Sequence, residues 1–339
     1  MKRLNLTAKI TAVILCAFAS LVIGICVGSV TVSPLHIFAA IKNSFFGVPL
    51  PSDVTEGEVS IIAGIRLPRV VLSFIVGAAF SVSGAAVQSV LRNPLASPFT
   101  LGTSSGASLG ASLVIVTGFS LFGSYSTAVG GAVFAVAAMF IMVAFARRLD
   151  RSLQSSTVVL TGMVLSLFIS AWVSLMATFS DERYRQLIKW QNGSFAGRGF
   201  GYSAVLLAVF AVCFTVFMIK SRQLDLLTFG DEQAMSIGVN TSAAKTILLV
   251  LASVLSGTAV AFAGVIGFVD LIAPHITRKI FGPKHKLLLP MTALVGGAFM
   301  TVCDIAARTL AVPNELPVGV ITSLIGAPFF AAVFFKRRR

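Results

Sequence analysis

Residues 69–91 read RVVLSFIVGAAFSVSGAAVQSVL, and the only charged residue in this run is Arg69 at its first position. About 20 apolar residues are enough to cross the hydrocarbon core of a bilayer as an α-helix. Nine further apolar runs lie at about 10–30, 101–118, 121–146, 156–179, 202–219, 243–262, 264–280, 287–306 and 317–335. The sequence therefore predicts an all-α polytopic membrane protein with about ten transmembrane helices in one domain, residues 1–339.

The composition of the whole chain agrees with a membrane protein. Of its 339 residues 56% are hydrophobic and only 11% are charged, whereas soluble domains carry roughly 25% charged residues. A soluble enzyme and a free nucleic-acid binder are therefore excluded, despite a net charge of +14. The first apolar run is longer than the apolar core of a signal peptide, about 7–15 residues, so we expect a retained helix there.

The distribution of basic residues predicts the orientation. If the N-terminus is cytoplasmic, 18 of the 26 Lys and Arg residues fall in inner segments and eight in outer segments. Because cytoplasmic segments collect Lys and Arg, we expect both termini on the cytoplasmic side. Two connections are long, an outer one from Thr31 to Ile65 and an inner one at about 221–244.

Motifs of soluble enzymes are absent or occur in the wrong setting. There is no P-loop and no H-E-x-x-H sequence, and the four cysteines and three histidines show no metal-ligand spacing. One G-x-S-x-G match, at 102–106, precedes Asp270 and His275 in the order of an α/β-hydrolase triad. That motif requires a strand–turn–helix setting, and here it opens an apolar helix. Close helix packing is therefore favoured over an intramembrane hydrolase that uses Ser104. We expect no catalytic residue, no bound metal and no cofactor in this chain.

Asp270 is the clearest charged residue within an apolar run, and such residues suggest function by default. One interpretation is the coupling carboxylate of a secondary transporter driven by an ion gradient. The other is a carboxylate placed near a helix N-terminus, where negative charge is favourable. The second interpretation is favoured, because the run begins at Gly264, only six residues earlier.

Two polar features allow a structural and a functional interpretation. Arg66, Arg69 and Arg308 lie at outer helix ends; they either extend toward lipid headgroups or form a basic surface that attracts an acidic partner. The inner segment from Asp231 to Gly238 predicts a short helix ended by a glycine. It is either an ordinary solvated loop or a docking helix for a cytosolic partner.

Three stretches of the chain resemble a known family. They are residues 66–107, which include RLPR at 66–69 and NPLASP at 93–98; residues 264–278, GVIGFVDLIAPHITR; and residues 287–330, which include LLLP, ELPVG and GAPFF. In this combination and order the chain is similar to the FecCD/BtuC-like family, whose members are permease subunits of type II ABC importers for iron-siderophores, haem or cobalamin. The resemblance implies the BtuC-like fold of ten helices.

The resemblance also implies partners. They are a second permease copy, identical or related, two cytosolic ATPase subunits that use ATP, and an extracytoplasmic substrate-binding protein. The resemblance implies a transport subunit without its own ATPase site, located in the cytoplasmic membrane of a prokaryote, with an iron-siderophore as the expected cargo.

Three groups of residues receive roles from the same resemblance. Glu232, Ala234 and Gly238 match the E-x-A-x-x-x-G pattern of the ATPase-coupling loop. Arg66, Arg69 and Arg308 match the positions that dock the binding protein. The cytoplasmic gate is matched by Asn93, Pro94, Leu95, Ser155 and Ser156. Asp270 departs from the family, which commonly has glycine at this position.

Overall fold

The computed structural model describes residues 5–28, 33–179 and 181–337, and within these ranges it contains helices but no strands. Seven helical segments in the described residues are long and apolar enough to cross a membrane, and Thr103–Thr117 and Val318–Val333 are shorter apolar helices. Each of the ten predicted runs contains one α-helix, and the runs at 101–118 and 121–146 also contain residues of a 3₁₀ helix. The predicted all-α polytopic fold is therefore confirmed. Lys2, Arg3, Arg338 and Arg339, which contribute to the predicted orientation, lie outside the described residues.

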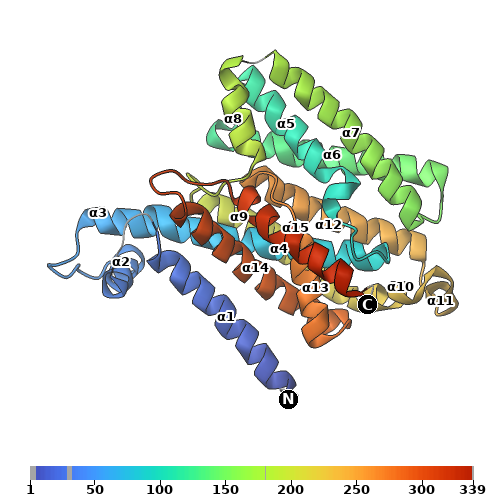
Figure 1. Ribbon diagram of the computed structural model, residues 1–339, viewed down its shortest axis with the longest axis horizontal. Helices are drawn as coiled ribbons and strands as arrows, with labels where there is room; N and C mark the ends of the chain where they lie inside the picture. The colour runs from blue at the N-terminus through green and yellow to red at the C-terminus, as the bar shows by residue number, and fades with distance from the viewer. Residues whose placement is uncertain (1–4, 29–32, 180, 338–339) are drawn as a thin grey trace.

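Figure 1 shows the order of the helices along the chain. They are α1 (Leu6–Cys26), α2 (Pro34–Phe46), α3 (Glu56–Val59), the π-helix η1 (Ser60–Arg66), α4 (Leu67–Val90), the 3₁₀ helix η2 (Pro98–Leu101), α5 (Thr103–Thr117), the 3₁₀ helix η3 (Gly123–Tyr125), α6 (Ser126–Leu149), α7 (Ser155–Thr178), α8 (Asp181–Gln191), α9 (Phe200–Ile219), α10 (Ser221–Phe229), α11 (Asp231–Ser236), α12 (Thr241–Ala263), α13 (Val269–Phe281), α14 (His285–Thr309) and α15 (Val318–Arg337).

The two long connections lie at opposite ends of the bundle. In Figure 1, α2 and α3 lie at the left of the view, whereas α10 and α11 lie at the right. Following the charge bias, we call the end with α2 and α3 the outer end and the end with α10 and α11 the inner end. Both long connections contain helices. The hydropathy pattern does not predict the helices of the outer connection.

Two of the predicted spans begin later than their apolar runs. The run at 264–280 starts with a loop, and α13 begins only at Val269 because Gly264 and Phe268 have left-handed backbones, with φ of 81° and 70°. A left-handed residue interrupts the helical hydrogen-bond pattern. The run at 101–118 is divided in the same way by Gly102, with φ of 89°, into η2 and α5.

The outer connection is held together by charged side chains. Thr55 and Glu58 form a capping box at the start of α3, and this helix continues through η1 into α4. His36 of α2 lies 3.0 Å from Glu58 and 3.3 Å from Asp53. The hydrogen bond with Glu58 raises the pKa of His36. The contact between His36 and Glu58 therefore joins α2 to the outer extension of α4.

Helix α4 occupies the centre of the bundle (Figure 1). Its most apolar window is 83% buried, compared with 17% for α1 at the periphery. Close approach is possible because glycines face neighbouring backbones: Gly77 faces Gly296 of α14, and Gly84 faces the carbonyl of Asp270 in α13. Small residues at such contacts are typical of helix packing in membranes, where apolar burial provides no driving force between helices.

Replacing Gly84 with Ala tests this packing. The added Cβ would overlap the carbonyl oxygen of Asp270, and overpacking of this kind costs about 1–3 kcal/mol. We expect a lower midpoint of thermal unfolding for the purified protein in detergent. Gly64→Ala is the matched control, because its nearest neighbour, Ser60 Oγ, would lie 4.0 Å from the new atom. Equal midpoints for the two variants would contradict the proposed contact.

Candidate functional site

A cleft of about 1110 Å³ opens at the inner end of the bundle. Its lining residues come from the turn after α4, the turn before α7, and α10–α11: Leu91, Arg92, Asn93, Ser152, Gln154, Ser155, Ser156, Phe229, Gly230, Asp231, Glu232, Gln233 and Met235. Of the residues predicted for the ATPase-coupling loop and the cytoplasmic gate, Glu232, Asn93, Ser155 and Ser156 line this cleft, whereas Ala234, Gly238, Pro94 and Leu95 are not among its lining residues.

The gate turn after α4 has a defined conformation. Asn93 accepts a hydrogen bond from the main-chain N–H of Leu95, at 2.9 Å from its Oδ1. Pro94 lies between them, and the Leu95 side chain is exposed. Arg92 has a left-handed backbone, with φ of 50°, which ends α4 sharply. The turn thus presents Leu95 at the inner end.

Helix α11 is the short helix predicted at 231–238, and it ends as predicted. The N–H of Gly238 bonds to the carbonyl of Met235 at 2.9 Å, and Gly238 has φ of 86°. Ala234 is fully buried and points into the protein, whereas Glu232 is exposed. The three residues of the coupling pattern therefore have different positions: one exposed side chain, one packing contact and one backbone turn.

A buried lysine attaches α11 to the gate side of the cleft. Lys245 of α12 lies 2.6 Å from Asp231. Its ammonium also donates to the carbonyls of Ser152 and Leu153, at 3.1 and 3.3 Å. Because the ammonium has three donors, it joins α11, α12 and the turn before α7 at one point.

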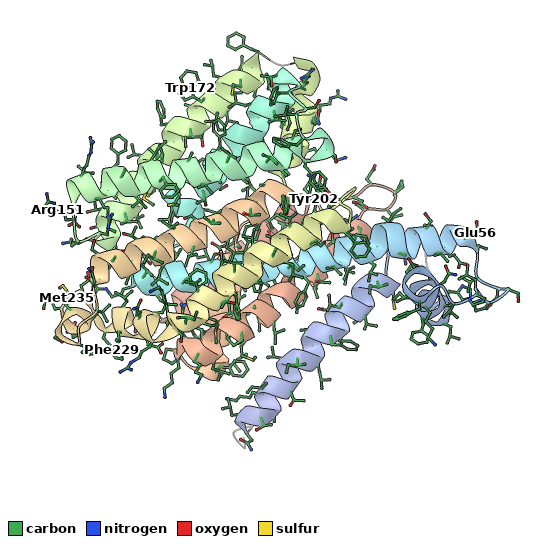
Figure 2. All side chains as sticks on the ribbon, turned by 180° about the vertical axis from the view of Figure 1, so that it is seen from behind. Glu56, Arg151, Trp172, Tyr202, Phe229 and Met235 are labelled. Atoms are coloured by element: carbon green, nitrogen blue, oxygen red, sulfur yellow. The ribbon has the colours of Figure 1, made fainter. Side chains whose placement is uncertain are left out.

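The surface of the inner end is rich in exposed apolar side chains. Phe229, Met235 and Ile237 are each more than half exposed, at 72%, 53% and 60%. Figure 2 shows Phe229 and Met235 at the same end as Arg151, with Glu56 at the opposite end. Exposed apolar side chains grouped among polar residues are typical of a protein–protein contact surface.

A second set of contacts joins α10 to the core, and we call it the inner polar chain. Asp225 of α10 accepts from Nδ1 and the main-chain N–H of His285, at 2.6 and 2.9 Å. Nε2 of His285 lies 2.7 Å from Ser89 Oγ. Arg278 of α13 donates to Ser89 and to the side chain of Gln88. The inner polar chain therefore connects α10 with α14, α4 and α13.

The predicted docking arginines lie at the outer end but are buried, with exposures of 5% for Arg66, 6% for Arg69 and 3% for Arg308. Arg69 binds Asp304 through Nε and Nη2 and binds Glu315 through Nη1 at 2.9 Å. Nε of Arg308 lies 3.4 Å from Asp304, and its Nη2 donates to the carbonyl of Gly24. Arg66 donates to the carbonyls of Ile25 and Cys26.

We call Arg69, Asp304, Arg308 and Glu315 the outer ion cluster. It joins the start of α4, the end of α14 and the segment before α15, and Arg308 extends it to the end of α1. Exposed cations at this end include Arg185 and Lys189 of α8, which line a cleft of about 620 Å³ together with Glu315. These two residues are among the eight basic residues of the predicted outer segments, and the sequence assigned them no role.

Asp270 lies in the first turn of α13 and is buried, with 1% exposure. Its Oδ2 accepts a hydrogen bond from Ser97, and its main-chain carbonyl accepts from Gln88 at 3.0 Å. This placement agrees with the favoured interpretation, a carboxylate near a helix N-terminus. Ser104 lines a cavity whose wall, in the described residues, includes neither Asp270 nor His275, and the ring of His275 packs edge-on against that of Phe329. This placement does not favour the hydrolase interpretation.

Comparisons with known proteins agree with this geometry. The model of the FecCD transport family matches residues 14–336. The chain belongs to the FecCD transport family. It is 39% identical over 322 residues to YvrB of Bacillus subtilis, an uncharacterized ABC transporter permease protein, covering 94% of this chain and 91% of the relative. It is also 39% identical over 278 residues to HmuU of Yersinia pestis, a hemin transport system permease protein, covering 81% and 83%.

The similarity extends to a solved structure of an ABC transporter assigned to the metal-chelate type and captured in an inward-facing conformation. The TM-score is 0.81 at 30% identity, covering 96% of this chain and 98% of that one. The predicted BtuC-like permease fold is therefore confirmed. Membership of the FecCD family does not favour the alternative interpretation, a secondary transporter driven by an ion gradient that uses Asp270. The roles of the individual site residues stay predictions.

The outer ion cluster predicts different effects for its two carboxylates. Asp304 is fully buried, whereas the Glu315 side chain is 38% exposed. Removing one partner of a buried pair costs about 3–5 kcal/mol, and exposed pairs contribute about 0–1 kcal/mol. We expect Asp304→Asn to lower the thermal unfolding midpoint much more than Glu315→Gln. Similar midpoints for both variants in detergent would contradict the assignment.

Proposed function

We propose that this chain is the permease subunit of an ABC importer that moves a metal chelate, foremost an iron-siderophore, across the cytoplasmic membrane. ATP is hydrolysed by two separate cytosolic ATPase subunits. The observation that carries the proposal is the inner cleft, where the coupling residue Glu232 lies beside gate residues Asn93 and Ser155. An exposed apolar surface next to this cleft supplies a contact for the ATPase.

The proposed coupling acts through α10 and α11. An ATPase that binds the exposed side of α11 moves this helix, and the ion pair between Asp231 and Lys245 transfers the movement to the turn before α7. The inner polar chain transfers movement of α10 to α4, whose C-terminal turn carries Asn93, Pro94 and Leu95. Pairs of charged groups suit this task because they fix relative position as well as attraction.

At the outer end we propose that an extracytoplasmic substrate-binding protein docks through acidic side chains. The residues proposed from the family resemblance are Arg66, Arg69 and Arg308. In the described conformation these guanidinium groups are buried, so docking requires that acidic groups of the partner reach between the helix ends. The remaining proposed partner is a second permease copy, identical or related, with the path for the cargo between the two. Both termini are proposed to be cytoplasmic.

The coupling role of α11 predicts the effect of Gly238→Val. A valine whose backbone must keep φ near 86° is strained by roughly 1–2 kcal/mol, so the backbone at the end of α11 should shift. No atom lies within 4 Å of the new Cβ, so the substitution introduces no steric clash. We expect uptake per ATP hydrolysed to fall about fivefold or more, measured in proteoliposomes that contain the permease, its ATPase and its binding protein.

Gly197→Val is the matched control for this experiment. Gly197 also has a left-handed backbone, with φ of 69°, and open space around it, but it lies in the segment before α9. Its uptake per ATP should match that of the wild type. Asp270→Asn should also retain ATP-driven uptake. Equal loss of coupling in the Gly197 and Gly238 variants would remove α11 from the mechanism, and ATP-independent uphill uptake by the permease alone would refute the importer proposal.

Docking is tested by two charge reversals. Arg66→Glu combined with Arg308→Glu should weaken association with the binding protein and reduce its dependence on salt, as measured by surface-based binding at several ionic strengths. Arg185→Glu combined with Lys189→Glu is the control on exposed cations of α8. The thermal midpoint of each variant shows whether it remains folded. Loss of association only in the α8 variant would move the docking site to that helix.

A further inference from the structure

Helix α2 of the outer connection exposes large apolar side chains. Leu35, Phe38 and Phe46 are 79%, 60% and 79% exposed. Together with Lys42 they follow one another at intervals of three or four residues, and this spacing places them on one face of the helix. Among the described residues, no other part of the chain covers this face. Because removing such side chains from water lowers the free energy, the face is suited to an apolar partner.

The opposite face of α2 is packed against the protein. Ile37 and Ala40 are buried together with Ile62 of η1. The last residues of α1, Ile25 and Cys26, pack against the same cluster. Helix α2 is therefore attached both to the outer end of α1 and to the outer extension of α4, and its apolar face points away from both.

The length of α1 indicates the depth of this attachment in a bilayer. Helix α1 has 21 residues, Leu6–Cys26, and a rise of about 1.5 Å per residue gives it a length of about 31 Å. The hydrocarbon core of a bilayer is about 30 Å thick, so a helix that spans it from Leu6 brings Cys26 to the outer boundary. Because α2 packs on Cys26, it lies at the level where acyl chains meet headgroups.

The direction of α2 agrees with this level. In Figure 1, α4 runs across the view, whereas α2 is strongly foreshortened beside its outer end, so α2 lies across the direction of α4. A helix in this direction lies along a membrane surface and does not span it. The exposed apolar residues of α1 continue to Val27, which is 38% exposed, and resume at Leu35. The apolar face of α2 thus continues the peripheral surface of the spanning helix α1.

Neutral polar groups and histidine occupy a separate flank of α2. His36 and Asn43 lie seven residues apart, which places them on one side of the helix. His36 contacts Glu58 and Asp53, and Asn43 donates to a carbonyl of the following loop. The Asp53 side chain is 70% exposed. This flank is therefore the side of α2 that faces water, and a soluble partner would meet it before the apolar face.

Lys42 lies within the apolar face. It is the only lysine, arginine, aspartate or glutamate of α2, and its ammonium lies 4.5 Å from the centroid of the Phe38 ring. A lysine at such a position covers apolar surface with its stem while its ammonium extends to the headgroups. Lipid phosphate is the anion present at that level of a phospholipid bilayer.

We propose that α2 is an interfacial helix whose partner is the outer surface of the lipid bilayer. Leu35, Phe38 and Phe46 enter the boundary of the acyl chains, and the ammonium of Lys42 binds headgroup phosphate. Because the opposite face of α2 is packed on η1, this contact holds the outer extension of α4 at a fixed depth. The contact with lipid depends neither on the cargo nor on the ATPase.

The test measures the depth of α2 by tryptophan fluorescence of the complete chain in nanodiscs. The lipid is phosphatidylcholine, either unmodified or brominated on its acyl chains. Phe38→Trp is introduced in a Trp172→Phe background, because Trp172 is itself 51% exposed. Trp190 is 9% exposed and remains in every variant, so its emission is subtracted. We expect brominated acyl chains to lower the emission from position 38 at least roughly twofold, and aqueous acrylamide to lower it little.

Ser52→Trp in the same background is the matched control. Ser52 is an exposed residue of the loop between α2 and α3, so acrylamide should quench a tryptophan there and brominated lipid should not. The role of Lys42 is tested in the Phe38→Trp variant. Adding Lys42→Glu should weaken quenching by lipid and strengthen quenching by acrylamide, whereas adding Lys42→Arg should leave both unchanged. The thermal midpoint of each variant in detergent shows whether it remains folded.

The other outcomes contradict definite parts of the proposal. Strong quenching at position 38 by acrylamide alone would place the apolar face in water and refute the lipid contact. Resistance to both quenchers would mean that a protein surface, such as a second permease copy, covers the face, and would refute it equally. Identical quenching in the Lys42→Glu and Lys42→Arg variants would remove the lysine from the contact. None of these results bears on the proposed importer function, which is tested by uptake.

Discussion

The close backbone contact of α4 with α13 and α14 is the constraint on which the other features depend. Gly77 and Gly84 allow α4 to approach these helices at distances that a Cβ would prevent. In a bilayer this packing cannot be replaced by apolar burial, because lipid solvates apolar side chains as well as protein does. Helix α4 is therefore positioned by shape, and the polar groups at its two ends are positioned with it.

These polar groups connect the two ends of the molecule through one helix. Arg69 at the start of α4 belongs to the outer ion cluster, and Gln88 and Ser89 near its end belong to the inner polar chain. A packed helix transmits displacement along its axis better than a flexible loop does, because its backbone hydrogen bonds resist extension. The architecture thus places one mechanical element between the proposed docking and coupling surfaces.

Sequence reasoning succeeded where the signal is local. Apolar runs identify helices because the bilayer requires them, and the glycine at 238 predicted the end of α11. It failed where partners are distant in sequence. The burial of Arg69 depends on Asp304 and Glu315, which lie 235 and 246 residues further along, and hydropathy contains no information about such pairs. The contact between Asp225 and His285 was missed for the same reason. The late start of α13 depends on the left-handed backbone of Phe268, which its residue type does not suggest.

The geometry of Arg69 has a consequence for replacement by residues of equal charge. One planar guanidinium serves two carboxylates through different edges, Nε and Nη2 toward Asp304 and Nη1 toward Glu315. A lysine carries the same charge on a single nitrogen, whose directions are not fixed in a plane. Lysine at this position would preserve electroneutrality but not the divergent geometry, and the segment before α15 would lose its attachment to α4.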